Sequence, residues 1–226
     1  MKNLFALLVL LSITTLSFAQ EKIELPTTKK NKGMENVRIG VDVTFDNWLN
    51  SPDSIKNNIL KSRGANVYAM YDIPFGSSDF SCAIGLGIGS NNFSNNAAIT
   101  YSGDTLTLLT PISTSYKANK LSVNYIDIPF EFRFKTKPDG SNQSFKFSIG
   151  AKAGYLINSH TKYKDTESKV KVYDIKNLDM YHYGVNAKIG YAWFSLTGYY
   201  ALSSLFVKDK GPNVMPFSIG ISITPN

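Results

Sequence analysis

The sequence predicts an all-β fold, an eight-stranded antiparallel up-and-down transmembrane β-barrel. Three observations predict it: apolar and polar residues alternate strictly, long and short connections alternate along the chain, and the polar face is rich in glycine. Because successive side chains of a strand point to opposite faces, such alternation gives a strand one apolar and one polar face. The clearest case is residues 125–135, where Ile126, Ile128, Phe130, Phe132 and Phe134 alternate with Tyr125, Asp127, Pro129, Glu131, Arg133 and Lys135.

Seven further segments alternate in the same way and complete the set of expected strands. The predicted strands span residues 37–45, 62–75, 80–91, 121–135, 145–157, 180–191, 193–202 and 214–224. The connections after the first, third, fifth and seventh strands are long, at residues 46–61, 92–120, 158–179 and 203–213. Within the third of these, residues 169–173 also alternate and are expected to extend the strands. This pattern is typical of membrane barrels, in which short turns face the periplasm and long loops face outside.

A soluble lipocalin-like binding barrel is the alternative, because it also has eight alternating strands. Two belts of aromatic residues favour the membrane, since such girdles mark the two interfaces of a lipid bilayer. The belt at the short-turn ends comprises Phe75, Phe80, Phe134, Phe145, Tyr191, Trp193 and Phe194. The belt toward the long loops comprises Phe45, Trp48, Phe93, Tyr125, Tyr155, Tyr181 and Tyr183. The apolar pocket that a lipocalin needs cannot be built from the charged face.

The N-terminal residues indicate the compartment. A basic start, a short apolar run and small residues before the cleavage point predict a signal peptide over residues 1–19, removed after Ala19. A basic periplasmic linker is expected over residues 20–36, followed by one barrel domain over residues 37–226. The single Cys82 excludes an intramolecular disulfide framework. An exported chain meets no nucleic acid, so its net charge of +7 does not indicate such a partner. We expect location in the outer membrane, with its lipid as a partner.

With the polar face inward, the sequence predicts a charge network in the lumen. It comprises Arg38, Asp42, Asp72, Asp127, Glu131, Arg133, Lys146, Lys152 and Lys188. Buried charges need partners, and eight strands leave no width for a column of water. We therefore expect a closed, ion-paired plug, in which Asp127 and Glu131 face Lys152 while Arg38 and Asp42 complete the ring. A narrow ion-selective pore is the alternative use of the same charges.

The chain lacks the common catalytic and nucleotide-binding motifs, such as a Walker loop, HExxH, CxxC or GxSxG, so neither a cofactor nor a metal is expected. The enzyme alternative is a lipid A-modifying hydrolase or acyltransferase at the outer rim. It would use a histidine with a serine and an acid, and the candidates are His160, His182, Ser159, Ser168, Glu167 and Asp179. Both histidines are interpreted instead as solvated rim residues.

Four segments resemble the PorT-like outer-membrane β-barrel family of Bacteroidota. They are the export signal ending Phe18-Ala19-Gln20, the glycine strand at 85–89, and the strand segments at 125–130 and 150–155. The resemblance implies an outer-membrane barrel, and some members of that family are linked to secretion-system assembly. It carries over no functional residue. Because loops on a rigid scaffold commonly hold function, we expect a non-enzymatic binding, assembly or structural role, with an unidentified protein partner at the extracellular loops of a monomer.

Overall fold

The computed structural model of the chain describes residues 36–103 and 105–225. The predicted signal peptide, and all of the predicted linker except Asn36, lie outside these residues. In the described part of the chain, none of the helices has the length and apolar character that crossing a membrane requires.

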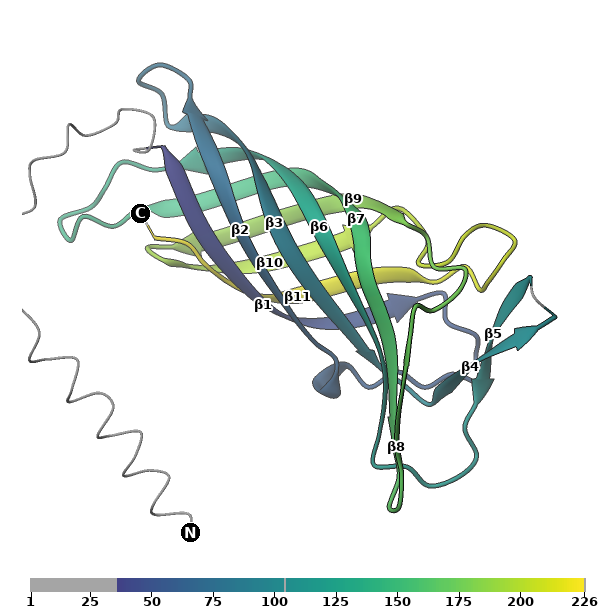
Figure 1. The fold of residues 1–226 in the computed structure, drawn as a ribbon. Helices are drawn as coiled ribbons and strands as arrows, with labels where there is room; N and C mark the ends of the chain where they lie inside the picture. Colours follow the sequence, from purple (N-terminus) through teal and green to yellow (C-terminus); the bar gives the residue numbers. More distant parts are fainter. Residues whose placement is uncertain (1–35, 104, 226) are drawn as a thin grey trace, which may run out of the picture. The chain divides into compact units, whose positions relative to one another are not determined.

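Eight antiparallel strands form a closed ring, in which each strand pairs with the next ring strand along the chain (Figure 1). Pairing of β6 with β7 and of β1 with β11 closes the ring. The ring strands are β1 (Val37–Leu49), β2 (Arg63–Pro74), β3 (Phe80–Ser94), β6 (Ala118–Lys135), β7 (Phe145–Lys164), β9 (Tyr181–Tyr191), β10 (Phe194–Ala201) and β11 (Met215–Ile223). All eight predicted strands correspond to ring strands, with ends that differ by a few residues.

The prediction of eight strands in total is wrong, because the described residues contain eleven. The additional strands are β4 (Ala97–Ser102), β5 (Leu106–Pro111) and β8 (Lys169–Tyr173). β4 and β5 form a separate hairpin inside a connection that we expected to be irregular. β8 pairs with the end of β7, which runs seven residues beyond its predicted limit. A single 3-10 turn, η2 (Ile59–Lys61), follows β1.

We call the three-stranded extension beyond the ring the arm. It consists of residues 118–124 of β6, residues 158–164 of β7, and β8. The arm and the β4–β5 hairpin lie at the end of the ring that carries the long connections (Figure 1). The short turns, at residues 75–79, 136–144 and 192–193, join the ring strands at the opposite end.

Alternation sorts the ring residues into an apolar outer face and a polar inner face, as the sequence predicts. On β6, Ile126 and Ile128 are exposed at 46% and 52%, whereas Asp127 and Glu131 are exposed at only 4% and 2%. A ring of exposed aliphatic side chains would be unstable against water but is well solvated by hydrocarbon. The outer face is therefore suited to contact lipid.

The belt at the short-turn ends is exposed on the outer face, apart from the half-buried Phe134, which packs against Phe80 with ring centroids 5.1 Å apart. In the other belt, Phe45, Tyr155, Tyr181 and Tyr183 are exposed.

Three members predicted for that second belt are buried instead: Trp48, Phe93 and Tyr125. By strand alternation they share the inward face with residues such as Asp127, so they cannot reach lipid. They belong to an apolar core that fills the long-loop end of the barrel, together with Leu121, Val123, Ile175, Leu178, Leu205, Phe206 and Val214.

Candidate functional site

Inward positions of the ring strands bring the charged and hydroxyl side chains together in the lumen. The first cluster is centred on Asp127. One carboxylate oxygen lies 2.6 Å from Nε2 of His182, and the other lies 3.2 Å from Nζ of Lys152. Nδ1 of His182 lies 3.0 Å from the hydroxyl of Tyr199, and its ring is 4.0 Å from that of Tyr125. Each polar group of the imidazole is therefore hydrogen-bonded inside the barrel.

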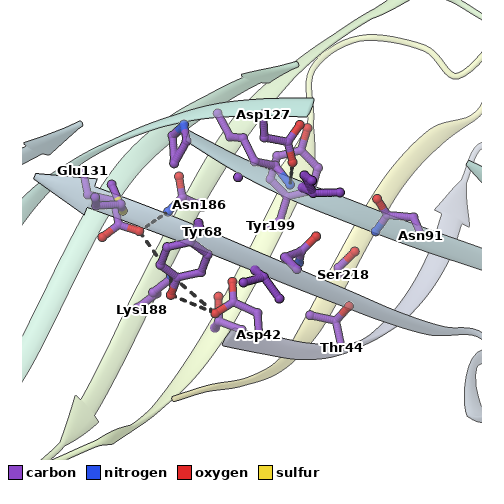
Figure 2. A pocket seen from close by; sticks show the side chains of 18 residues that line it. Asp42, Thr44, Tyr68, Asn91, Asp127, Glu131, Asn186, Lys188, Tyr199 and Ser218 are labelled. Atoms are coloured by element: carbon purple, nitrogen blue, oxygen red, sulfur yellow. Dashed lines mark hydrogen bonds and ion pairs between the residues drawn. The ribbon is translucent and has the colours of Figure 1, made fainter. Parts of the chain in front are cut away.

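The second cluster is centred on Lys188 (Figure 2). Its ammonium group lies 3.2 Å from Glu131 and 3.6 Å from Asp42, and it donates a 2.6 Å hydrogen bond to the hydroxyl of Tyr68. That hydroxyl donates in turn to Asp42 at 3.0 Å and lies 2.9 Å from Oγ of Ser222. Strands on opposite sides of the ring, β2 and β9, are thus joined across the lumen by the hydrogen bond from Lys188 to Tyr68.

The third cluster lies nearer the short-turn end. Arg133 forms an ion pair with Glu131 at 2.7 Å and another with Asp72. Asp72 also lies 3.7 Å from Arg38. Glu131 therefore joins the second and third clusters, because Lys188 and Arg133 bind different oxygens of one carboxylate.

The structure brings together eight of the nine predicted lumen residues, with partners that differ in part from the prediction. Lys152 pairs with Asp127 but not with Glu131, whose oxygens are already held by Arg133 and Lys188. Lys146 has no ion pair among the described residues, and it donates instead to the backbone carbonyl of Thr224 at 3.2 Å.

Sequence reasoning missed the neutral members of the network. His182 was interpreted as a solvated rim residue, which is wrong: it is 9% exposed and lies beside Asp127. Tyr68 and Tyr199 were not assigned to the network either, although both join clusters of charges. The alternation along strands β2, β9 and β10 could have identified them, because it places these side chains on the inward face, among the acids and lysines.

Asp46 is a buried carboxylate that no prediction included. Its side chain accepts hydrogen bonds from Thr44 at 2.8 Å, Ser218 at 2.7 Å and the backbone N–H of Asn92 at 3.0 Å. Among the described residues, no lysine, arginine or histidine pairs with it. Hydrogen bonds from neutral donors therefore stabilise this carboxylate.

The space that remains in the lumen is small. A cavity of about 50 Å³ lies among the side chains of the first two clusters (Figure 2). A second cavity, of about 140 Å³, lies around Arg133 at the short-turn end. Both are below the roughly 300–1,000 Å³ typical of ligand pockets. The described residues contain no group of three or more His, Cys, Asp or Glu residues arranged to hold a metal ion.

The rim residues considered for catalysis are not assembled into a triad in the described part of the chain. Ser159 and His160 are adjacent on β7 and point to opposite faces, and Ser159 accepts a hydrogen bond from the backbone of Ile175. Ser168 donates to Asp165 at 2.9 Å. The ring of His160 lies against Tyr173, with centroids 5.6 Å apart.

A larger cavity than either of the two in the lumen lies at the long-loop end. This cleft has a volume of about 330 Å³ and is bounded by the β4–β5 hairpin, the arm and Trp48. Its apolar lining includes Ala97, Ile99, Leu109, Leu121, Tyr163, Val170 and Val172. Two buried donors near it, Nε1 of Trp48 and Nδ2 of Asn95, have no acceptor among the described residues.

Comparison with known proteins agrees with this architecture. No curated protein matches the chain. A model of the outer membrane protein beta-barrel domain matches residues 15–207, which is most of the sequence. That match, the closed antiparallel ring and the apolar outer face place the protein in the outer membrane. The chain therefore belongs to the family of outer membrane proteins with this beta-barrel domain.

Proposed function

We propose that this protein is a non-enzymatic binding, assembly or structural protein of the PorT-like group of Bacteroidota, acting through extracellular loops on an eight-stranded transmembrane barrel with a closed lumen. The observation that carries the proposal is the position of the cavities. A cavity of about 330 Å³ lies among the loop segments, whereas the two cavities described inside the barrel are only about 50 and 140 Å³ and lie among the charged side chains. The soluble lipocalin alternative is set aside, because the chain is an outer-membrane barrel.

The chemistry of the cleft supports a partner that combines apolar side chains with hydrogen-bond acceptors. Val170 and Val172, which line the cleft, are each 50% exposed. The donors of Trp48 and Asn95 remain without an acceptor among the described residues. An extended segment of a protein partner offers both apolar side chains and backbone carbonyls.

The absence of an assembled rim triad in the described residues supports the non-enzymatic part of the proposal. Ser168 is hydrogen-bonded to Asp165, and His182 is enclosed in the lumen. We expect His160→Ala and His182→Ala to leave the mass spectrum of lipid A unchanged. An altered acylation pattern in either variant would contradict the non-enzymatic assignment.

The test replaces the hairpin, residues 97–111, by a flexible Gly-Ser linker and recovers crosslinked partners from outer membranes. We expect the variant to lose proteins that the unaltered barrel retains. The matched control replaces residues 137–142 in a short turn at the opposite end of the barrel. Both variants must keep a gel mobility that depends on boiling, which reports a folded barrel. Retention of every partner by the hairpin variant would refute a binding role for the cleft.

A further inference from the structure

The outer face of the arm carries a row of lysines. Lys120 lies directly opposite Lys162, and Lys162 lies directly opposite Lys171, so strands β6, β7 and β8 each contribute one residue. Directly opposed residues of antiparallel strands share a face, with Cβ atoms about 4.5–5.5 Å apart. On β3, the residue opposite Lys120 is Ser94, which lies on the same side as the exposed Ile88. The lysine row therefore continues the lipid-facing surface beyond the membrane.

No carboxylate pairs with this row among the described residues. Nζ of Lys120 donates to the side chain of Asn92 at 2.7 Å, which fixes its position without neutralising it. Burial lowers the pKa of Lys120, and the charges of Lys162 and Lys171 lower it further. The nearby Asp165 is engaged by the turn between β7 and β8, where it accepts hydrogen bonds from Glu167 and Ser168.

Two further basic groups adjoin the row. His160 lies two residues before Lys162 on the same face of β7, and burial together with the three lysines lowers its pKa. Arg63 begins β2, and its backbone carbonyl accepts a 2.8 Å hydrogen bond from Asn92. Like charges directly opposite one another on adjacent strands destabilise a sheet. A bound polyanion would remove that repulsion and would gain several charge-assisted contacts.

The distance of the row from the membrane decides which phosphate groups can reach it. Lys162 is seven residues beyond Tyr155, an exposed member of the aromatic belt. At about 3.3 Å per residue, the row lies on the order of 20 Å along the strand from that belt. The headgroup layer of an ordinary bilayer adds only about 5–7 Å on each side. Phosphates carried on a saccharide reach the row, whereas phospholipid phosphates lie below it.

We propose that Lys120, Lys162 and Lys171 form a binding site for the phosphorylated saccharide of an outer-leaflet glycolipid. Lys162 and Lys171 do not line the cleft, although Lys120 borders it, so the site goes beyond the partner binding proposed for the cleft. It requires only that the long-loop end faces outside, as in other outer-membrane barrels. The glycolipid would stabilise the arm, which otherwise holds opposed lysines at its edge.

The test measures binding of lipopolysaccharide to the full mature protein in zwitterionic detergent, by titration followed with native mass spectrometry. We expect the triple variant Lys120→Gln, Lys162→Gln, Lys171→Gln to bind at least tenfold more weakly and to show no rise in Tm with lipopolysaccharide. The control removes three exposed lysines elsewhere, by Lys137→Gln, Lys208→Gln and Lys210→Gln, and should bind within twofold of the unaltered protein. The single variant Lys171→Gln, on the exposed β8, provides a milder change that should weaken binding partially.

Three results would overturn the assignment. The first is a folded triple variant that binds as tightly as the control. The second is equal binding of lipopolysaccharide from which the phosphates have been removed. The third is competition by phosphatidylglycerol or by inorganic phosphate at matched phosphate concentration, which would indicate a general anion surface. Loss of hairpin-dependent protein partners tests the cleft and does not bear on these outcomes.

Discussion

At the scale of single residues, small side chains allow the charged network to form. Gly154 of β7 lies in register between Asp127 of β6 and His182 of β9. A Cβ at this position would clash with the carboxylate of Asp127 and with Nε2 of His182, and it would lie 2.8 Å from a backbone oxygen of β6. Because glycine has no Cβ, the carboxylate and the imidazole meet above β7 at 2.6 Å.

We expect Gly154→Ala to lower the free energy of unfolding by roughly 1–3 kcal/mol, the usual cost of overpacking a filled interior. The added methyl group would force apart Asp127 and His182. Urea unfolding of the barrel in lipid vesicles measures the change. Gly198→Ala is the matched control, since its Cβ would meet nothing within 4 Å and alanine is preferred over glycine in a strand. Equal stability of the two variants would contradict the role of Gly154.

At the scale of the element, β6 combines the two environments of the barrel in one strand. Ile128 is 52% exposed on the outer face, whereas Asp127 and Glu131 of the same strand are buried in the charge network. A strand of this kind is stable only with lipid on one side and a packed polar interior on the other.

We expect Ile128→Arg to cost roughly 2–4 kcal/mol, because an arginine at the bilayer midplane must leave water for hydrocarbon. Ile149→Arg, on the adjacent strand β7 and 53% exposed, should behave alike. The control is Ile157→Arg, two residues beyond the belt residue Tyr155, where the cost near the interface is about 0–1 kcal/mol. Unfolding titrations in vesicles provide all three values. If Ile128→Arg were as well tolerated as Ile157→Arg, its side chain could not face midplane lipid.

At the scale of the whole molecule, polar contacts inside the lumen hold the strands of the ring together. Lys188 of β9 connects Glu131 of β6 with Asp42 of β1 and donates to Tyr68 of β2, on the opposite wall of the ring. Lys152 and Asp127 pair on the adjacent strands β7 and β6. The strands leave no unpaired edge within the ring, which gives closed barrels their resistance to detergent.

We expect purified protein in planar bilayers to give no sustained single-channel steps. Glu131→Gln and Lys152→Gln should instead lower stability by roughly 3–5 kcal/mol, since each leaves a buried charge without its partner. Gel mobility before and after boiling reports the folded fraction of each variant. Lys137→Gln, in an exposed turn, serves as the neutral control. Conductance steps that change with either lumen substitution would show that the charges line a pore.

The barrel architecture can be predicted from the sequence, because alternation is a local property that is kept in every ring strand. Alternation placed the ring strands, the inward set of charges and the exposed belt at the short-turn ends. It also placed β8 in an alternating segment, residues 169–173. Each of these follows from which face a side chain occupies, and that face is set by the parity of its position.

Which inward residues meet, and which aromatic residues face lipid, depends on how the strands are arranged in three dimensions. Register and strand twist place Lys188 beside Glu131, two strands away in the ring. The two residues are 57 positions apart in the sequence, and alternation shows only that both point inward. Trp48 and His182 also occupy inward positions. Trp48 packs in the apolar core, and His182 binds Asp127. Pairing partners depend on how strands from distant parts of the chain are staggered around a closed ring, and that stagger is a property of the whole barrel.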